Sequence, residues 1–139
     1  MREQYEEISQ EGFQVIAVAP SNASFISDFL ESFGPYPFPI VGDPKRKAYR
    51  GMGHHTMPKF KLLSKSLLGF LSGKVKNFIP KDKQQAKVVK KAMTSQDVYI
   101  QGGTWIFDEQ GNVLWKHIDT SPEKHANINE VIKQVKQAD

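Results

Sequence analysis

Residues 13–19, with the sequence FQVIAVA, constrain the fold of this chain more than any other segment. They are rich in β-branched side chains and almost wholly apolar, a pattern that predicts a strand buried on both faces, as in a parallel sheet. Pro20 ends this strand, and Ser21 or Asn22 can cap a helix over residues 23–33. A buried strand that leads into an amphipathic helix is typical of α/β domains.

The rest of the chain continues this alternation and then changes to a hairpin. Hydrophobic period, capping residues and turn residues predict helices over residues 2–11, 45–50, 57–93 (broken by glycines and a proline) and 126–137, and strands over 38–41, 98–100, 104–107 and 112–118. Strands with crossover helices come first, and an antiparallel hairpin with a last helix follows. We treat residues 57–93 as a helical insertion between two elements of the core.

The insertion carries most of the positive charge. Ten lysines and one acid, Asp82, lie between Lys59 and Lys91, so this block has a charge of +9 and the remainder sums to −5. The simplest interpretation is a solvated face over the core. Association of residues 60–79 with an anionic membrane surface is a weaker alternative. We expect no nucleic-acid partner, because no aromatic residues interleave with the basic run after Lys81.

Residues 60–79 also contain four lysines, which argue against a simple membrane-spanning helix. No apolar leader follows Met1, so the sequence predicts a soluble, cytoplasmic protein.

The chain contains no cysteine, which excludes thiolate nucleophiles, disulfides and zinc sites built on sulfur. Its histidines offer no alternative metal site. His54 and His55 are adjacent, His117 lies in a predicted strand and His125 lies near a helix start, and none shows a metal-binding spacing. We therefore expect neither a metal ion nor another cofactor.

Two runs carry a resemblance to a known family: PFPIVGDPKRKAYRGMG at residues 37–53 and QGGTWIFDEQGNVLWKH at 101–117. Together with residues 13–36 and 125–135 they resemble the AhpC/TSA-type peroxiredoxin-like proteins, in particular the peroxiredoxin-like 2 branch. The resemblance implies an α/β, thioredoxin-like three-layer sandwich with a mixed sheet, formed by a single domain over residues 1–139. It also implies an antioxidant thiol oxidoreductase that acts on a protein thiol or a small-molecule substrate.

In that family a strand and a C-x-x-C or related motif precede the first helix. Arg2 looks like the arginine that follows the motif, so we expect the chain to lack the family's first strand and its cysteines. Residues 13–19 and the strand that starts at Thr104 would then lack their shared neighbour. Gly102, Gly103 and Thr104 match the family's GGT loop, which faces the redox motif.

The resemblance thus predicts a substrate-facing groove of Arg2, Gly102, Gly103 and Thr104, with no catalytic residue. A bend before a strand, without a binding role, is the alternative for the two glycines. Two hypotheses follow for the chain. It is part of a thiol oxidoreductase whose cysteine motif lies outside residues 1–139, or it is a cysteine-free binding or interaction module, which could also be membrane-peripheral. Both predict that these residues alone are redox-inactive.

Overall fold

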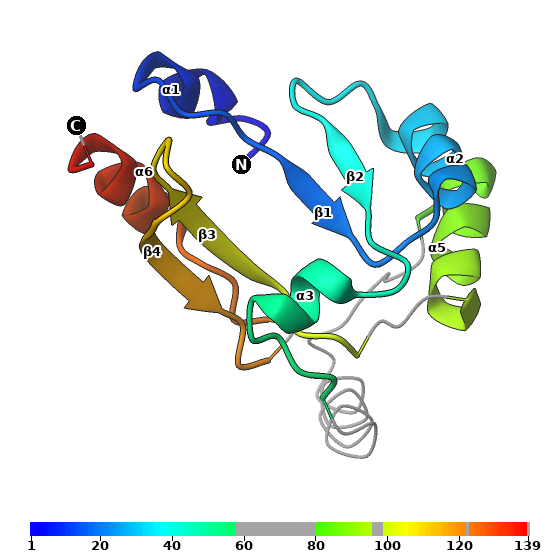
Figure 1. Ribbon diagram of the computed structural model, residues 1–139. Coiled ribbons are helices and arrows are strands. Elements are labelled where there is room, and N and C mark those ends of the chain that lie inside the picture. Colours follow the sequence, from blue (N-terminus) through cyan, green and yellow to red (C-terminus); the bar gives the residue numbers. More distant parts are fainter. Residues whose placement is uncertain (58–79, 96–98, 122, 139) are drawn as a thin grey trace, which may run out of the picture. The chain divides into compact units, whose positions relative to one another are not determined.

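The computed structural model describes residues 1–57, 80–95, 99–121 and 123–138 (Figure 1). In chain order the elements are α1 (Tyr5–Gln10), β1 (Ala17–Ala19), α2 (Ala23–Phe33), β2 (Ile40–Gly42), α3 (Lys47–Gly51), α5 (Lys83–Ser95), β3 (Gly103–Phe107), β4 (Val113–Ile118) and α6 (Ile128–Lys136). They fall into two compact units. The first contains Met1–Val18, Tyr36–Val41 and Gln101–Asp139, and the second contains Ala19–Pro35 and Gly42–Ile100. The single domain over residues 1–139 stays a prediction.

The described strands form two separate two-stranded sheets, β1–β2 and β3–β4. In the first, the Ala17 N–H donates to Pro39 O at 3.0 Å and the Asp43 N–H donates to Ala19 O at 2.7 Å, so the two strands run parallel. The second sheet is antiparallel. The α/β, thioredoxin-like fold class is therefore confirmed, with both strand directions present. The absence of a strand shared by β1 and β3, among the described residues, is also as predicted.

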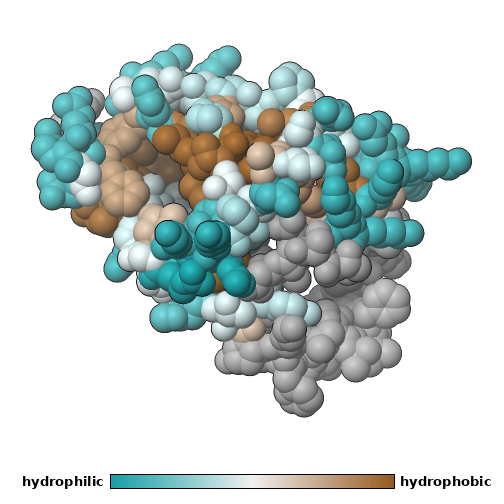
Figure 2. Space-filling view, turned by 45° about the vertical axis from the view of Figure 1, so that its right-hand side comes forward, coloured by the Kyte–Doolittle hydropathy of each residue, from teal (hydrophilic) through white to brown (hydrophobic). Residues whose placement is uncertain are grey.

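The predicted burial of residues 13–19 on both faces is wrong. Only Ala17–Ala19 form a strand, and Ile16 and Val18 are 58% and 42% exposed. Phe13 and Val15, which alternate with them, pack against the core of the first unit. Successive side chains of an extended segment point to opposite faces, and here one face alone is covered. Other apolar side chains are also exposed, and they include Val41, Phe107, Val113 and Leu114. Figure 2 shows hydrophobic residues, in brown, at the surface of one face.

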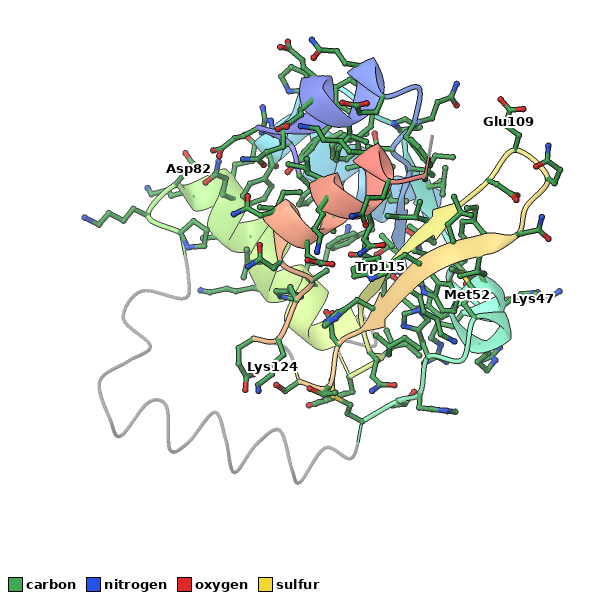
Figure 3. The ribbon with its side chains drawn as sticks, turned by 90° about the vertical axis from the view of Figure 1, so that its left-hand side faces the viewer. Lys47, Met52, Asp82, Glu109, Trp115 and Lys124 are labelled. Atoms are coloured by element: carbon green, nitrogen blue, oxygen red, sulfur yellow. The ribbon has the colours of Figure 1, made fainter. Side chains whose placement is uncertain are left out.

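The core of the first unit joins α1, the β3–β4 hairpin and α6. Ile8, Ile106, Val131 and Val135 are buried together, and Trp115 packs against them. Figure 3 shows Trp115 between the hairpin and α6. The apolar face predicted for the last helix is confirmed, because its residues at helical spacing are the ones that enter this core.

The Asp108 side chain stabilises the hairpin turn through hydrogen bonds with the backbone. Asp108 accepts hydrogen bonds from the backbone N–H of Gln110 at 3.0 Å and of Asn112 at 2.7 Å, while Gly111 takes a φ of +84°. The side-chain amide of Asn112 and the backbone N–H groups hold the pKa of Asp108 below its usual value despite some burial. An ionised carboxylate therefore closes the turn near neutral pH.

The second unit packs α2 against α5 (Figure 1). Helix α2 begins where the sequence predicts, because Asn22 Oδ1 accepts the Phe25 N–H at 2.9 Å. Between the two helices, Lys91 Nζ lies 2.6 Å from Asp28 Oδ2, and Gln85 Nε2 donates to the Ser32 carbonyl at 3.1 Å. Helix α5 corresponds to the last part of the broken helical stretch predicted over residues 57–93.

Several predicted boundaries shift. The first helix begins at Tyr5, and the predicted helix over residues 45–50 is α3. Asp43 accepts hydrogen bonds from the first N–H groups of α3, and Arg46, with a φ of 53°, occupies the position before the helix. In the predicted strand over 98–100, the described Ile100 forms only an isolated bridge with Thr56.

The apolar stretch over residues 60–79, with the membrane-surface alternative that rests on it, lies outside the described residues. In the described part of the chain, no helix has the length and apolar content needed to cross a membrane.

Candidate functional site

The four residues predicted to face a substrate all belong to the first unit, but Arg2 has different neighbours from the Gly102–Thr104 segment. The Arg2 guanidinium lies 4.7 Å from the centre of the Tyr36 ring, a cation–π contact just before α1. Gly103 and Thr104 are the first residues of β3. Gly103 pairs with Ile118 of β4, and Thr104 pairs with His117. The groove of Arg2, Gly102, Gly103 and Thr104 therefore stays a prediction.

Gly102 lies against a buried carboxylate. The Asp119 N–H donates to the Gly102 carbonyl at 3.0 Å, and a Cβ added at Gly102 would lie only 2.7 Å from Asp119 Oδ2. The resemblance predicts that this glycine faces a substrate, with a bend before the strand as the alternative. The structure supplies an internal reason for it, because the space that a side chain would need is occupied by Asp119.

Replacing Gly102 with alanine should lower the free energy of unfolding by about 1–3 kcal/mol, the usual cost of inserting a methyl group into filled space. The methyl group would push the Asp119 carboxylate out of its position. Urea unfolding followed by tryptophan fluorescence would measure the loss, because both tryptophans lie on the β3–β4 hairpin.

The matched control is the same substitution in a chain that also carries Asp119→Ala, which removes the oxygen that the methyl group meets. Gly102→Ala should then cost much less than in the native background, giving a coupling energy of about 0.5–3 kcal/mol between the two positions. Equal costs in both backgrounds would contradict the steric explanation.

Asp119 is the centre of a cluster of polar groups. Its residue surface is 3% exposed, and its Oδ2 lies 2.7 Å from His125 Nδ1. On the other side, Oδ1 lies 3.5 Å from His117 Nε2, and the Asp119 carbonyl accepts a hydrogen bond from Gln101 Nε2 at 3.1 Å. The cluster therefore joins the segment before β3, the end of β4 and the segment before α6.

The partners of the two histidines indicate where their protons lie. A carboxylate and a carbonyl oxygen can only accept hydrogen bonds, so His125 Nδ1 donates to Asp119. In the same way His117 Nε2 donates to the Lys124 carbonyl at 2.9 Å. Asp119 Oδ1 is buried and has no hydrogen-bond partner within the described ranges. In the neutral form of His125, the lone pair is consequently on Nε2.

The sequence alone favours surface or locally hydrogen-bonded histidines over metal ligands, and it indicates no role for Asp119. Within the residues that the structure describes, no three histidine or acidic side chains are grouped so that they could hold a metal ion. The available signal was an aspartate directly after an apolar strand that ends in His117 and Ile118. That signal does not reveal the His125 contact, which depends on the path of the intervening loop.

The second unit contains a buried histidine that packs against a tyrosine. His54 is 4% exposed, its backbone N–H donates to the Tyr49 carbonyl at 2.9 Å, and the two rings meet edge to face at 5.5 Å. Burial raises the pKa of Tyr49, and the nearby charge of Asp43 raises it further. The phenol therefore stays protonated near neutral pH and packs against the His54 ring.

The model of a family described as AhpC/TSA antioxidant enzyme matches residues 1–121. This range includes Arg2, the Gly102–Thr104 segment and Asp119, and it ends before His125. No curated protein and no solved structure matches the chain.

Proposed function

Because the chain belongs to the AhpC/TSA antioxidant enzyme family, we propose that its 139 residues bind a substrate of a thiol-dependent oxidoreductase but catalyse no thiol reaction themselves. The observation that carries this proposal is the absence of cysteine from the chain. Thiol-based reduction of a peroxide or a disulfide needs a thiolate as the nucleophile. A serine hydroxyl cannot replace it without an adjacent general base.

The contact would be made by the segment that leads into β3. Gly103 is exposed and has no side chain, so a protein thiol or a small-molecule substrate can approach the backbone closely. Arg2 is an exposed cation in the same unit, and it would attract an anionic group. The hydrogen bond from the Asp119 N–H to the Gly102 carbonyl supports this proposal, because it would restrain the segment that makes the contact.

A peroxide-consumption assay with dithiothreitol as the reductant tests the first half of the proposal. We expect the purified chain to consume hydrogen peroxide no faster than buffer. A cysteine-containing member of the same family, assayed at equal concentration, is the positive control. A rate that rises in proportion to the concentration of this chain, and that survives dialysis against a chelator, would contradict the proposal.

The contact half is tested in the same preparation by titrating the ¹⁵N-labelled chain with glutathione, a small anionic thiol. The backbone signals of Gly103 and Thr104 should shift in a saturable way, and Arg2→Gln should weaken the binding. Shifts confined to other segments would remove the support for this binding face. If no signal shifts, the binding half of the proposal is wrong and only the absence of thiol turnover remains.

A further inference from the structure

We propose that His125 is a nucleophilic imidazole, oriented by Asp119, that accepts acyl groups from activated acyl donors such as aryl esters. This activity goes beyond the proposed function, because it needs neither a thiol nor a redox partner. The site lies within the first unit and uses side chains from the segments after β4 and before α6.

The first argument is the combination of an exposed imidazole with a buried carboxylate. The His125 side chain is 71% exposed, whereas the Asp119 side chain is 4% exposed, and Nδ1 lies 2.7 Å from Oδ2. Because Nδ1 carries the hydrogen of this bond, the lone pair of the neutral ring is on Nε2. The geometry thus favours the tautomer whose lone pair is on Nε2, the nitrogen that does not contact Asp119, while the orienting carboxylate is shielded from water.

The second argument is the contrast with the other histidine of the cluster. His117 donates its Nε2 hydrogen to the Lys124 carbonyl, and its ring stacks on Trp115 with a centroid distance of 6.3 Å. Its Nε2 therefore has no lone pair to offer in this arrangement. The lone pair of a neutral His117 is on Nδ1, in a side chain that is 35% exposed, whereas the His125 side chain is 71% exposed and carries its lone pair on Nε2.

The reaction would proceed in two steps. Nε2 attacks the carbonyl carbon of the ester, a C–N bond forms, and the phenolate leaves with the electron pair of the broken C–O bond. The positive charge that develops on the ring is stabilised by the Asp119 carboxylate through the Nδ1 hydrogen. Water then attacks the acyl-imidazolium, the C–N bond breaks, the carboxylic acid leaves, the electron pair returns to Nε2, and the remaining proton of the water passes to solvent. The sum is ester hydrolysis, with no oxidant or reductant.

The test is the release of p-nitrophenolate from p-nitrophenyl acetate by the full chain at about pH 8, where an ordinary imidazole is neutral. Mass spectrometry after a short exposure to diethyl pyrocarbonate locates the modified histidine. We expect His125 to be modified about tenfold faster than His117, and His125→Gln to abolish the ester reaction above background. His125 is largely exposed, so this variant should fold normally.

Two further variants separate positioning from general reactivity. Asp119→Asn should lower the reaction at His125 about tenfold, because the amide can donate to Nδ1 and place the hydrogen on Nε2. His55→Gln, in the other unit, should keep the native rate. The proposal is overturned if His125→Gln reacts like the native chain, or if a folded Asp119→Asn chain, checked by circular dichroism, retains the native rate.

Discussion

Replacing Ile106 with alanine should lower the free energy of unfolding by about 2–5 kcal/mol, the usual cost of truncating a buried isoleucine. Ile106 is 5% exposed and lies in a cluster with Ile8 of α1 and Val131 and Val135 of α6. Its loss would leave a cavity where three elements meet. Because small domains have a total stability of only about 5–15 kcal/mol, this single change would remove a large part of it.

Urea unfolding followed by tryptophan fluorescence suits this measurement, because Ile106 lies opposite Trp115 in the hairpin. Leu114→Ala is the matched control, since Leu114 is on β4 but 45% exposed. Its effect should stay within about 0.5 kcal/mol. Similar losses for the two variants, or a loss below about 1 kcal/mol for Ile106→Ala, would show that the cluster is not the core of the first unit.

Replacing Gly42 with alanine should destabilise the second unit, by an amount near the upper end of the range of about 1–3 kcal/mol for overpacking. An added Cβ would lie 2.4 Å from the Ser21 carbonyl oxygen and 3.1 Å from Ile26 Cδ1. A side chain could rotate out of the way, but the Ser21 carbonyl belongs to the backbone just before α2. The chain at the end of β2 would have to move instead.

Hydrogen exchange of the α2 amides is the appropriate measurement, because both tryptophans lie in the first unit. The Phe25 and Ile26 amides should exchange faster in Gly42→Ala. The control is Gly51→Ala, where an added Cβ meets no atom within 4 Å. If both variants exchanged at the same rate, the close approach at Gly42 would have no energetic consequence.

The sequence by itself determined the elements whose signals are local. Helix α2 begins after Asn22 and ends before Gly34, both as predicted, because a capping side chain and a terminating glycine act on neighbouring backbone groups. The hairpin turn and the apolar face of α6 were also predicted, because turn residues and the helical spacing of apolar residues are local signals. The count of cysteines, which excludes thiol chemistry in these residues, needs no structure at all.

Only the tertiary structure decided how residues from separate segments meet. Hydrophobic pattern could not show that Ile16 and Val18 are exposed, because burial depends on what packs over a face. Nor could spacing show that Gly102 makes room for Asp119, or that His125 returns to the same carboxylate. Those contacts exist because the β3–β4 pairing and the loop before α6 bring the three residues together, and hydrogen bonds form only at such short range.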